Sequence, residues 1–132
     1  MAGKSERRVR GWRVASYGLL IVWVGCAVLG MNKVRAGFLT NYGADVTQPA
    51  WLYIVTRGLD DPGRRSRVKR WFGATPERAA MVIFLAAALT EASQRVWPTG
   101  VFAGRFDPLD IVAYAVGVGA CYAIDRLGAQ SE

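Results

Sequence analysis

Apolar residues gather in long segments along this chain, and charged connections separate those segments. The longest stretch without a charged residue covers residues 14–32, nineteen positions in all. A helix rises about 1.5 Å per residue and the hydrocarbon core of a bilayer is about 30 Å thick, so a run of about 20 apolar residues can cross it. We therefore predict a membrane-spanning helix over residues 14–32.

Three other segments are candidates for further spans. Segments 79–97 and 106–124 each combine an apolar run with polar residues that can lie near the membrane surface, and each has the required length. Segment 36–56 lacks Lys and Arg but contains polar residues such as Asn41 and Asp45. Hydropathy by itself leaves open whether this segment crosses the bilayer.

The basic residues indicate that segment 36–56 does cross. The chain has 17 Lys and Arg against 10 Asp and Glu, and the basic residues concentrate before residue 14 and within residues 57–78. Basic loops beside membrane helices stay on the cytoplasmic side. Both regions can be cytoplasmic only if the chain crosses the membrane an even number of times between them. Segment 36–56 is the available returning span.

The charge distribution gives the predicted topology. Four of the 17 basic residues, Lys33, Arg35, Arg95 and Arg105, fall on the outer side, and the others fall inside. We expect an all-α fold, a transmembrane four-helix bundle of the inner (plasma) membrane with both termini in the cytoplasm. A basic N-terminus (1–13) precedes a single membrane domain (14–126) and a short tail (127–132). This asymmetry explains the basic pI without a nucleic-acid partner and leaves membrane lipids as expected partners.

A basic N-terminus before an apolar segment is also typical of a cleaved signal peptide. No small-x-small cleavage site follows the apolar run, and Cys26 lacks the Leu that a lipoprotein signal places before it. The apolar run also continues past Cys26. We therefore expect the first segment to remain as a membrane anchor.

Cofactor chemistry is not indicated. Cys26 and Cys121 both lie within apolar segments, where cysteine acts as a small hydrophobic residue. The chain contains no histidine, which removes the commonest transition-metal ligand. We expect no disulfide, metal or cofactor.

Small and aromatic residues predict how the helices pack. Small residues four positions apart allow helix backbones to approach closely in lipid. This spacing occurs at Cys26 and Gly30, and again along the last segment at Ala113, Gly117 and Cys121. Tryptophans are predicted as interfacial anchors near span ends, at positions 12, 71 and 97.

Polar residues concentrate around the connection between the last two segments. Glu91 and Gln94 share one face at the end of the third segment, and Asp107, Asp110 and Tyr114 follow one stripe of the fourth. Pro98, Gly100 and Gly104 make the connection a turn. We expect the carboxylates to converge near the outer surface with Arg105 as their cation, joined by Asn41 and Asp45. The candidate ligand-binding residues are Asp45, Glu91, Gln94, Arg105, Asp107 and Asp110.

Three interpretations of this constellation stay open. Charged groups at membrane depth cost about 2.5–3.5 kcal/mol each, so they face the protein interior and pair. They can form an internal network that fixes the turn, a site for a lipid or small-ligand head group, or a catalytic site. Catalysis is the least favoured, because no nucleophile with an adjacent base is evident. A divalent cation could bind these oxygens, but no spacing requires one.

At these residues the chain resembles VanZ-like proteins and a related uncharacterised family of small bacterial membrane proteins. The shared pattern is Glu-x-x-Gln, Pro, Gly-Arg-x-x-Asp, and then Asp and Gly in the next span. This chain meets it with Glu91, Gln94, Pro98, Gly104, Arg105, Asp110 and Gly117, and an Asp also stands at 107. VanZ-like members place Asn four residues after the second-span Asp, where this chain has Tyr114. That departure favours the uncharacterised relatives. For VanZ-like proteins, the resemblance implies reduced susceptibility to teicoplanin-type antibiotics.

Two functional hypotheses follow. The first is a non-enzymatic envelope protein whose outer polar site recognises a lipid or envelope-linked group. The second is a small proton or cation transporter or channel subunit, with Asp45, Glu91 and Asp110 along the path. A lipid hydrolase or transferase is a third class, but the chain lacks histidine and an activated Ser or Cys. Four short helices make a thin bundle, so self-association is also expected.

Overall fold

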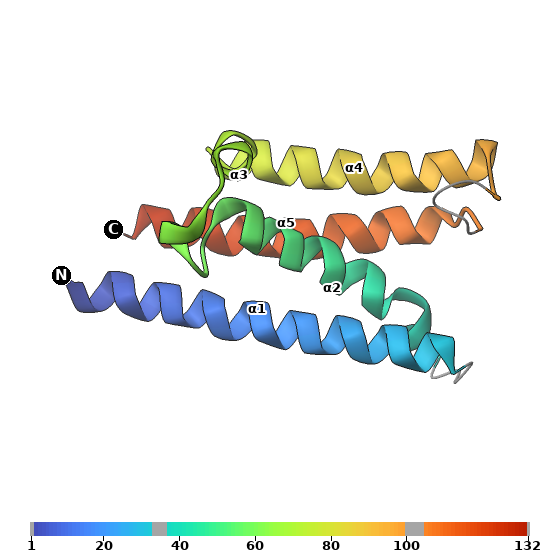
Figure 1. Cartoon of the computed structure of the whole chain (residues 1–132), viewed down its shortest axis with the longest axis horizontal. Coiled ribbons are helices and arrows are strands. Elements are labelled where there is room, and N and C mark those ends of the chain that lie inside the picture. The colour runs from blue at the N-terminus through green and yellow to red at the C-terminus, as the bar shows by residue number, and fades with distance from the viewer. Residues whose placement is uncertain (1, 33–36, 100–104, 132) are drawn as a thin grey trace.

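The computed structural model describes residues 2–32, 37–99 and 105–131. Within these ranges the chain is helical and contains no strand. The elements are the long helices α1 (Ala2–Met31), α2 (Phe38–Arg57), α4 (Pro76–Val96) and α5 (Pro108–Gln130), with the short η1 (Pro62–Arg64) and α3 (Arg67–Phe72) between α2 and α4. Figure 1 shows the long helices side by side, with α3 at one end.

Local sequence signals explain where the helices begin and end. Thr75 caps α4 by accepting a hydrogen bond from the Arg78 backbone N–H at 3.1 Å, and Pro76 occupies the first turn. Asp107 caps α5 in the same way, with Leu109 N–H at 2.9 Å from Oδ1. These are favoured capping residues. At Gly58 the backbone turns left-handed, with φ of 65°, and ends α2.

Three helices are long and apolar enough to cross a membrane: Gly3–Met31, Pro76–Val96 and Pro108–Gln130. They contain most of the predicted spans 14–32, 79–97 and 106–124. Segment 36–56 forms helix α2, which is not among the three. The all-α prediction is therefore confirmed for the described residues, together with three membrane-type helices.

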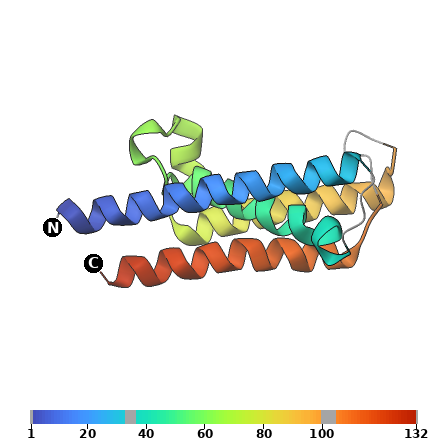
Figure 2. The same cartoon turned by 90° about the horizontal axis from the view of Figure 1, so that it is seen from below.

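Helix α2 lies at the centre of the bundle. It packs against α1, α4 and α5, and α4 packs against α5. Figures 1 and 2 show α1 on one side of α2, with α4 and α5 on the other. Between residues 42 and 57 only Gln48 is exposed. The most polar of the long segments is thus enclosed by neighbouring helices, where its polar groups can find partners.

The core forms where α2 meets the other helices. Its buried residues are Trp12, Ala50, Tyr53, Ile54, Ala79, Ile83, Val118 and Cys121. The prediction that Trp12 anchors the chain at the membrane surface is wrong, because this side chain is 8% exposed and packs in the core. Trp71 and Trp97 are exposed, as interfacial anchors require.

A close backbone contact joins α5 to α2 at Gly117. A Cβ atom at this position would lie 2.2 Å from the Val46 carbonyl oxygen, a separation no side chain can tolerate. Ala113 and Cys121, one turn away on either side, are also buried. The predicted small-residue stripe on α5 is therefore a packing surface. The matching prediction for α1 holds only for Cys26, which is buried, because Gly30 is exposed.

Large apolar side chains cover the outside of the bundle. A water-soluble protein of this size rarely exposes so many together, whereas a lipid-facing surface is made of them. They occur on α1, α4 and α5, and include Val14, Ile21, Val28, Met31, Met81, Leu85, Leu89, Leu109, Val112, Val116 and Ile124. The outer surface of these helices is thus suited to hydrocarbon.

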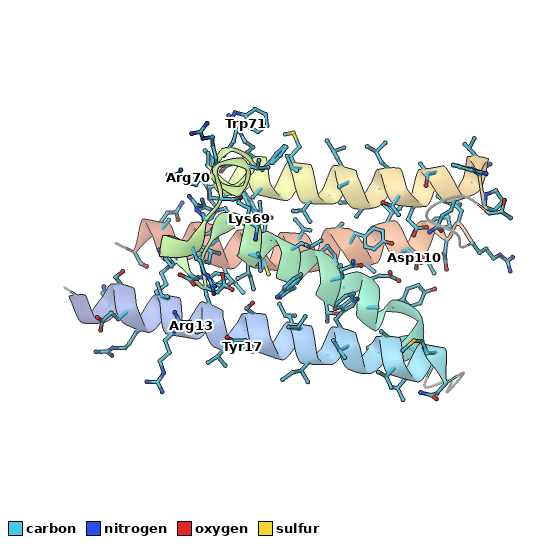
Figure 3. All side chains as sticks on the ribbon, viewed as in Figure 1. Arg13, Tyr17, Lys69, Arg70, Trp71 and Asp110 are labelled. Carbon is cyan, nitrogen blue, oxygen red and sulfur yellow. The ribbon has the colours of Figure 1, made fainter. Side chains whose placement is uncertain are left out.

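The two ends of the bundle differ in charge. Both termini and the segment 58–75 lie at one end, which we call the basic end (Figures 1 and 2). Figure 3 shows Lys69, Arg70 and Trp71 on α3 there, with Asp110 toward the opposite end. We call that opposite end the acidic end, after Asp45, Glu91, Asp107 and Asp110.

Candidate functional site

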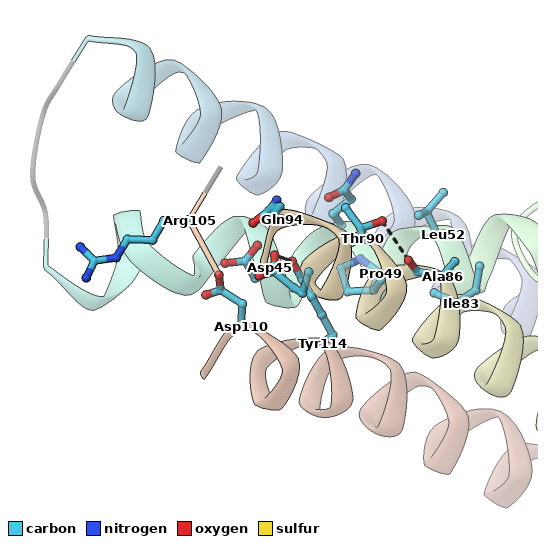
Figure 4. A pocket seen from close by; sticks show the side chains of 13 residues that line it. Asp45, Pro49, Leu52, Ile83, Ala86, Thr90, Gln94, Arg105, Asp110 and Tyr114 are labelled. Atoms are coloured by element: carbon cyan, nitrogen blue, oxygen red, sulfur yellow. Dashed lines mark hydrogen bonds between the residues drawn. The ribbon is translucent and has the colours of Figure 1, made fainter. Parts of the chain in front are cut away.

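A pocket of about 590 Å³ lies at the acidic end, between α2, α4 and α5 (Figure 4). Its lining divides into two parts. Polar groups from three helices and from Arg105 line one part: Asp45, Gln48, Thr90, Glu91, Gln94, Asp110 and Tyr114. Apolar side chains of α2 and α4 line the other part: Pro49, Leu52, Ile83, Ala86 and Ala87. The pocket therefore offers a polar region continuous with an apolar one.

Glu91 is the most buried polar residue of the pocket, at 3% exposed. Its Oε1 accepts a hydrogen bond of 2.8 Å from the Tyr114 hydroxyl. Its Oε2 is buried and has no hydrogen-bond partner within the described ranges. A buried acceptor without a partner costs about 1–3 kcal/mol, and more when it is charged. Glu91 Oε2 is thus an unsatisfied acceptor in the wall of a pocket.

Asp45 on α2 and Asp110 on α5 bring two further carboxyl groups into the same pocket. The two interact electrostatically with each other and with Glu91. Pro49 lies within α2 and has no N–H, so the Asp45 carbonyl oxygen lacks its usual helical partner. The ion pairs found in the described part of the chain do not include these three acids. The polar part of the pocket therefore carries several acceptors and three acidic groups without a basic partner in the described residues.

Arg105 and Asp107 do not take the roles expected of them. Arg105 lines the pocket, but Figure 4 shows its guanidinium directed away from the acids. Across the ranges that the structure describes, it forms no ion pair with them, so the expected pairing is not seen. Asp107 caps α5 and accepts a hydrogen bond of 3.3 Å from the Tyr42 hydroxyl, in a neighbouring cleft.

The other predicted residues divide between the pocket and the undescribed part of the chain. Gln94, Glu91, Asp45 and Asp110 line the pocket together, as the spacing predicted. The expected contribution of the Asn41 side chain lies outside what the structure describes, and so does the turn at Gly100 and Gly104.

A second polar cluster, which the sequence did not reveal, lies at the basic end. Asp125 on α5 is fully buried. Its Oδ2 accepts hydrogen bonds from Arg57 Nε at 2.8 Å and from the Tyr53 hydroxyl at 2.9 Å. Its Oδ1 lies 3.2 Å from Arg8 Nη2, which also donates to the Asp125 carbonyl oxygen at 3.1 Å. We call these four residues the Asp125 cluster.

The Asp125 cluster ties together parts of the chain that are distant in sequence. It joins α1, α2 and α5, and Arg57 also donates to the Gly73 carbonyl oxygen at 2.8 Å. A signal for it was present: the stripe through residues 110, 114, 117 and 121 reaches 125 after one more turn. Asp125 lies one residue beyond the predicted span 106–124, so the sequence did not mark it as a buried group.

The two clusters can do different chemistry. In the Asp125 cluster both carboxylate oxygens have partners, which is the arrangement of a structural tie. The pocket has acceptors to offer to a bound molecule. The described residues contain no grouping of acidic or cysteine side chains that could hold a metal ion. The Thr90 hydroxyl in the pocket donates to the Ala86 carbonyl at 2.9 Å and so has no activating base.

The chain was also compared with known proteins. No family model, no curated protein and no solved structure matches it. The resemblance to VanZ-like proteins therefore stays a prediction, and the functional argument depends on the pocket and its chemistry.

Proposed function

We propose that this chain is a non-enzymatic, multi-pass protein of the bacterial inner membrane whose pocket binds an amphiphile, either a lipid or an envelope-linked group. The carrying observation is Glu91 Oε2, a buried acceptor without a partner in the described residues, in the wall of a pocket that continues into an apolar region. An amphiphile has the complementary shape: a polar head that can donate to Glu91 and a hydrocarbon part for Leu52 and Ile83.

The membrane arrangement is part of the proposal. Helix α2 runs beside α1, α4 and α5, all three of which are membrane-type by themselves, so it crosses the bilayer with them as a fourth span. Its polar residues are tolerated because neighbouring helices cover them. The end that holds both termini and residues 58–75 is the most basic, so the positive-inside rule assigns it to the cytoplasm. The pocket then lies near the outer surface.

Two alternatives from the sequence have less support. An internal network should pair its charges, as the Asp125 cluster does, whereas Glu91 keeps an unpaired oxygen. A proton or cation path should continue toward the basic end. The apolar core residues Ala50, Ile54 and Val118 come between the pocket and Asp125 along α2 and α5.

The resemblance to VanZ-like proteins and their uncharacterised relatives supports an envelope role. Of the positions that carry it, Glu91, Gln94, Arg105 and Asp110 line the pocket, and Gly117 makes the close contact between α5 and α2. These residues of the shared pattern thus either line the pocket or pack α5 against α2.

Blocking the pocket tests the binding function. The substitution Ala87→Trp places a large ring in the apolar part of the pocket, whereas Ala92→Trp adds the same ring to an exposed position of the same helix. A photoreactive amphiphile with a twelve-carbon chain is crosslinked to the purified full chain, and labelled peptides are identified by mass spectrometry. We expect Ala87→Trp to abolish labelling of pocket residues and Ala92→Trp to preserve it. Equal labelling of both variants would refute the proposed function.

Reporter fusions test the topology. A cytoplasmic reporter and a periplasmic reporter are fused after residue 66 and after residue 99, in the connections at the two ends of the bundle. We expect residue 66 on the same side as the N-terminus and residue 99 on the opposite side. If residue 66 lies opposite the N-terminus, α2 does not cross the membrane and the outer pocket does not exist.

A further inference from the structure

The charge of the pocket indicates which amphiphile it takes. Glu91, Asp45 and Asp110 approach one another from three helices, and the ion pairs of the described residues leave all three out. Arg105 is directed away from them (Figure 4). A phosphate or carboxylate head group would add an anion beside three acidic groups that have no basic partner in the described residues, and like charges repel strongly in surroundings of low polarity. The acidic lining of the pocket therefore disfavours the binding of an anionic head group.

The hydrogen-bonding groups of the pocket narrow the choice further. The Tyr114 hydroxyl donates to Glu91 Oε1 and fixes the carboxylate, and the buried Oε2 has no partner in the described residues. An ammonium group has three donors and no acceptor. We infer that the pocket binds the primary ammonium head group of an amphiphile, with Glu91 as its principal partner and Asp45 and Asp110 as flanking acceptors. This inference rests on the proposed function.

The shape of the pocket favours an organic cation over an ion. Nowhere in the described residues are acids grouped closely enough to hold a metal ion. The pocket is large, about 590 Å³, and Pro49, Leu52 and Ile83 line its apolar part. Bare cations gain nothing from such a lining, whereas an alkyl chain is removed from water along it. A primary amine with an alkyl chain satisfies both parts of the pocket.

Quaternary ammonium ligands are a poorer fit. They have no N–H donor and are usually held by several aromatic faces. Tyr114 is the single aromatic residue among the described residues that line this pocket, and its hydroxyl is engaged by Glu91. The unpaired Glu91 oxygen needs a donor, which a primary amine supplies.

The Asp125 cluster shows how the same fold satisfies a buried acid internally. There, two arginines and a tyrosine from α1 and α2 neutralise and bond one carboxylate. At the pocket the chain supplies a tyrosine but no paired cation among the described residues. A cationic head group would supply at the pocket the kind of partner that Arg8 and Arg57 supply to Asp125.

Matched probes test this inference. The full chain, purified in a neutral detergent, is titrated with dodecylamine, dodecanol and dodecanoate, which share one chain and differ in the head group. Bound probe is counted by native mass spectrometry. A hydrogen bond to a charged group contributes enough to change affinity about tenfold or more, so we expect dodecylamine to bind at least about tenfold tighter than dodecanol, and dodecanoate to bind weakest.

Short-chain phospholipids separate the possible sources of the amine. Dioctanoyl phosphatidylethanolamine carries a primary ammonium next to a phosphate, whereas the phosphatidylcholine of the same length is fully methylated. If phosphatidylethanolamine binds preferentially, the ligand is a membrane lipid. If only dodecylamine binds, the ligand is an amine-bearing envelope group without a phosphate. Both results support the inference, and equal binding of the two phospholipids and the three single-chain probes overturns it.

Two variants test the partner of the amine. Glu91→Gln keeps an acceptor for Tyr114 and replaces the free oxygen with a donor, so dodecylamine should fall to the affinity of dodecanol. Glu77→Gln alters an exposed acid at the other end of α4 and should leave the preference unchanged. Should Glu91→Gln fail to fold, Asp110→Asn is measured in its place, with an expected partial loss. A preference for the amine that survives in the folded variant overturns the inference.

The proposed function and this inference fail in different ways. If all three probes bind equally and Ala87→Trp excludes them all, the pocket takes amphiphiles without selecting an amine, and only the inference fails. If no probe binds in a manner that Ala87→Trp prevents, both fail.

Discussion

Two buried acidic side chains, Glu91 and Asp125, lie at opposite ends of the same bundle and differ in the hydrogen-bond partners that the bundle gives them. Glu91 is 3% exposed and Asp125 is fully buried, so both are removed from solvent. Asp125 receives hydrogen bonds from Arg8, Tyr53 and Arg57, which satisfy both of its oxygens. Glu91 receives one from Tyr114, and its second oxygen has no partner in the described residues.

Under the proposed function, this difference separates a structural role for Asp125 from a binding role for Glu91. A buried carboxylate is tolerated where cations and donors surround it, and the Asp125 cluster provides both. Arg105 lies at the acidic end, yet its side chain is not turned toward the carboxylates beside it (Figure 4). A carboxylate oxygen that has no hydrogen-bond partner in a pocket can accept a hydrogen bond from a ligand. The following experiments test this contrast, from the largest expected effect to the smallest.

Removing the Asp125 carboxylate should have the largest effect. In Asp125→Ala, Arg8 and Arg57 lose their common partner and face each other across a partly buried site. Breaking such a network costs about 3–5 kcal/mol, so the free energy of unfolding in detergent should fall by that amount. Asp61→Ala, an exposed acid in the segment before α3, is the control and should change little. A small effect of Asp125→Ala would show that the tie is not structural.

A methyl group at Gly117 should affect both regions, because the contact between α5 and α2 supports both. In Gly117→Ala the added Cβ meets the Val46 carbonyl at 2.2 Å, so the helices must separate. Overpacking of this kind costs about 1–3 kcal/mol. Gly119→Ala meets nothing within 4 Å and should instead stabilise α5, by about 0.5–1 kcal/mol. Equal effects in thermal unfolding would contradict the close approach.

Neutralising Glu91 should change stability far less than removing Asp125. Glu91→Gln keeps the acceptor for Tyr114 and removes a charge for which the described residues provide no ion-pair partner. We expect the free energy of unfolding to change by less than about 1 kcal/mol, although the preference for dodecylamine over dodecanol is lost. A loss of stability as large as that of Asp125→Ala would mean that Glu91 is a structural group, and the contrast would disappear.

Arg105→Ala should have the smallest effect on stability. The side chain is exposed at the edge of the pocket, and substitutions at such positions usually lie within about 0.5 kcal/mol. Affinity for dodecylamine should stay the same or rise slightly, since a neighbouring positive charge is removed. A severalfold loss of affinity would show instead that Arg105 turns toward the ligand.

Much of the site could be predicted from the sequence. Glu91 and Gln94 are three residues apart on one helix, and Asp110 and Tyr114 are four apart on the next, so helical periodicity alone places each pair on one face. Gly117 continues the stripe of Asp110 and belongs to the surface that packs on α2. The predicted group of Asp45, Glu91, Gln94 and Asp110 therefore meets in one pocket.

Other features depended on contacts that no local pattern encodes. Trp12 has the position of an interfacial residue but packs in the core, because α1 turns that face toward α2. Arg105 precedes two aspartates in sequence but does not pair with the pocket acids (Figure 4). Asp125 and its partner Arg8 are 117 residues apart, so their bond depends on how α1 and α5 meet at the basic end.

The sequence by itself determined the helical fold and three membrane-type helices, because hydropathy and helical spacing are properties of neighbouring residues. It also placed Glu91 and Asp110 on the faces of their helices that line the pocket. The tertiary structure decided which faces meet, that α2 lies at the centre, and which buried acid receives its arginines. Those outcomes depend on the packing of helices distant in sequence, where a rotation of one helix changes the partner of every side chain on it.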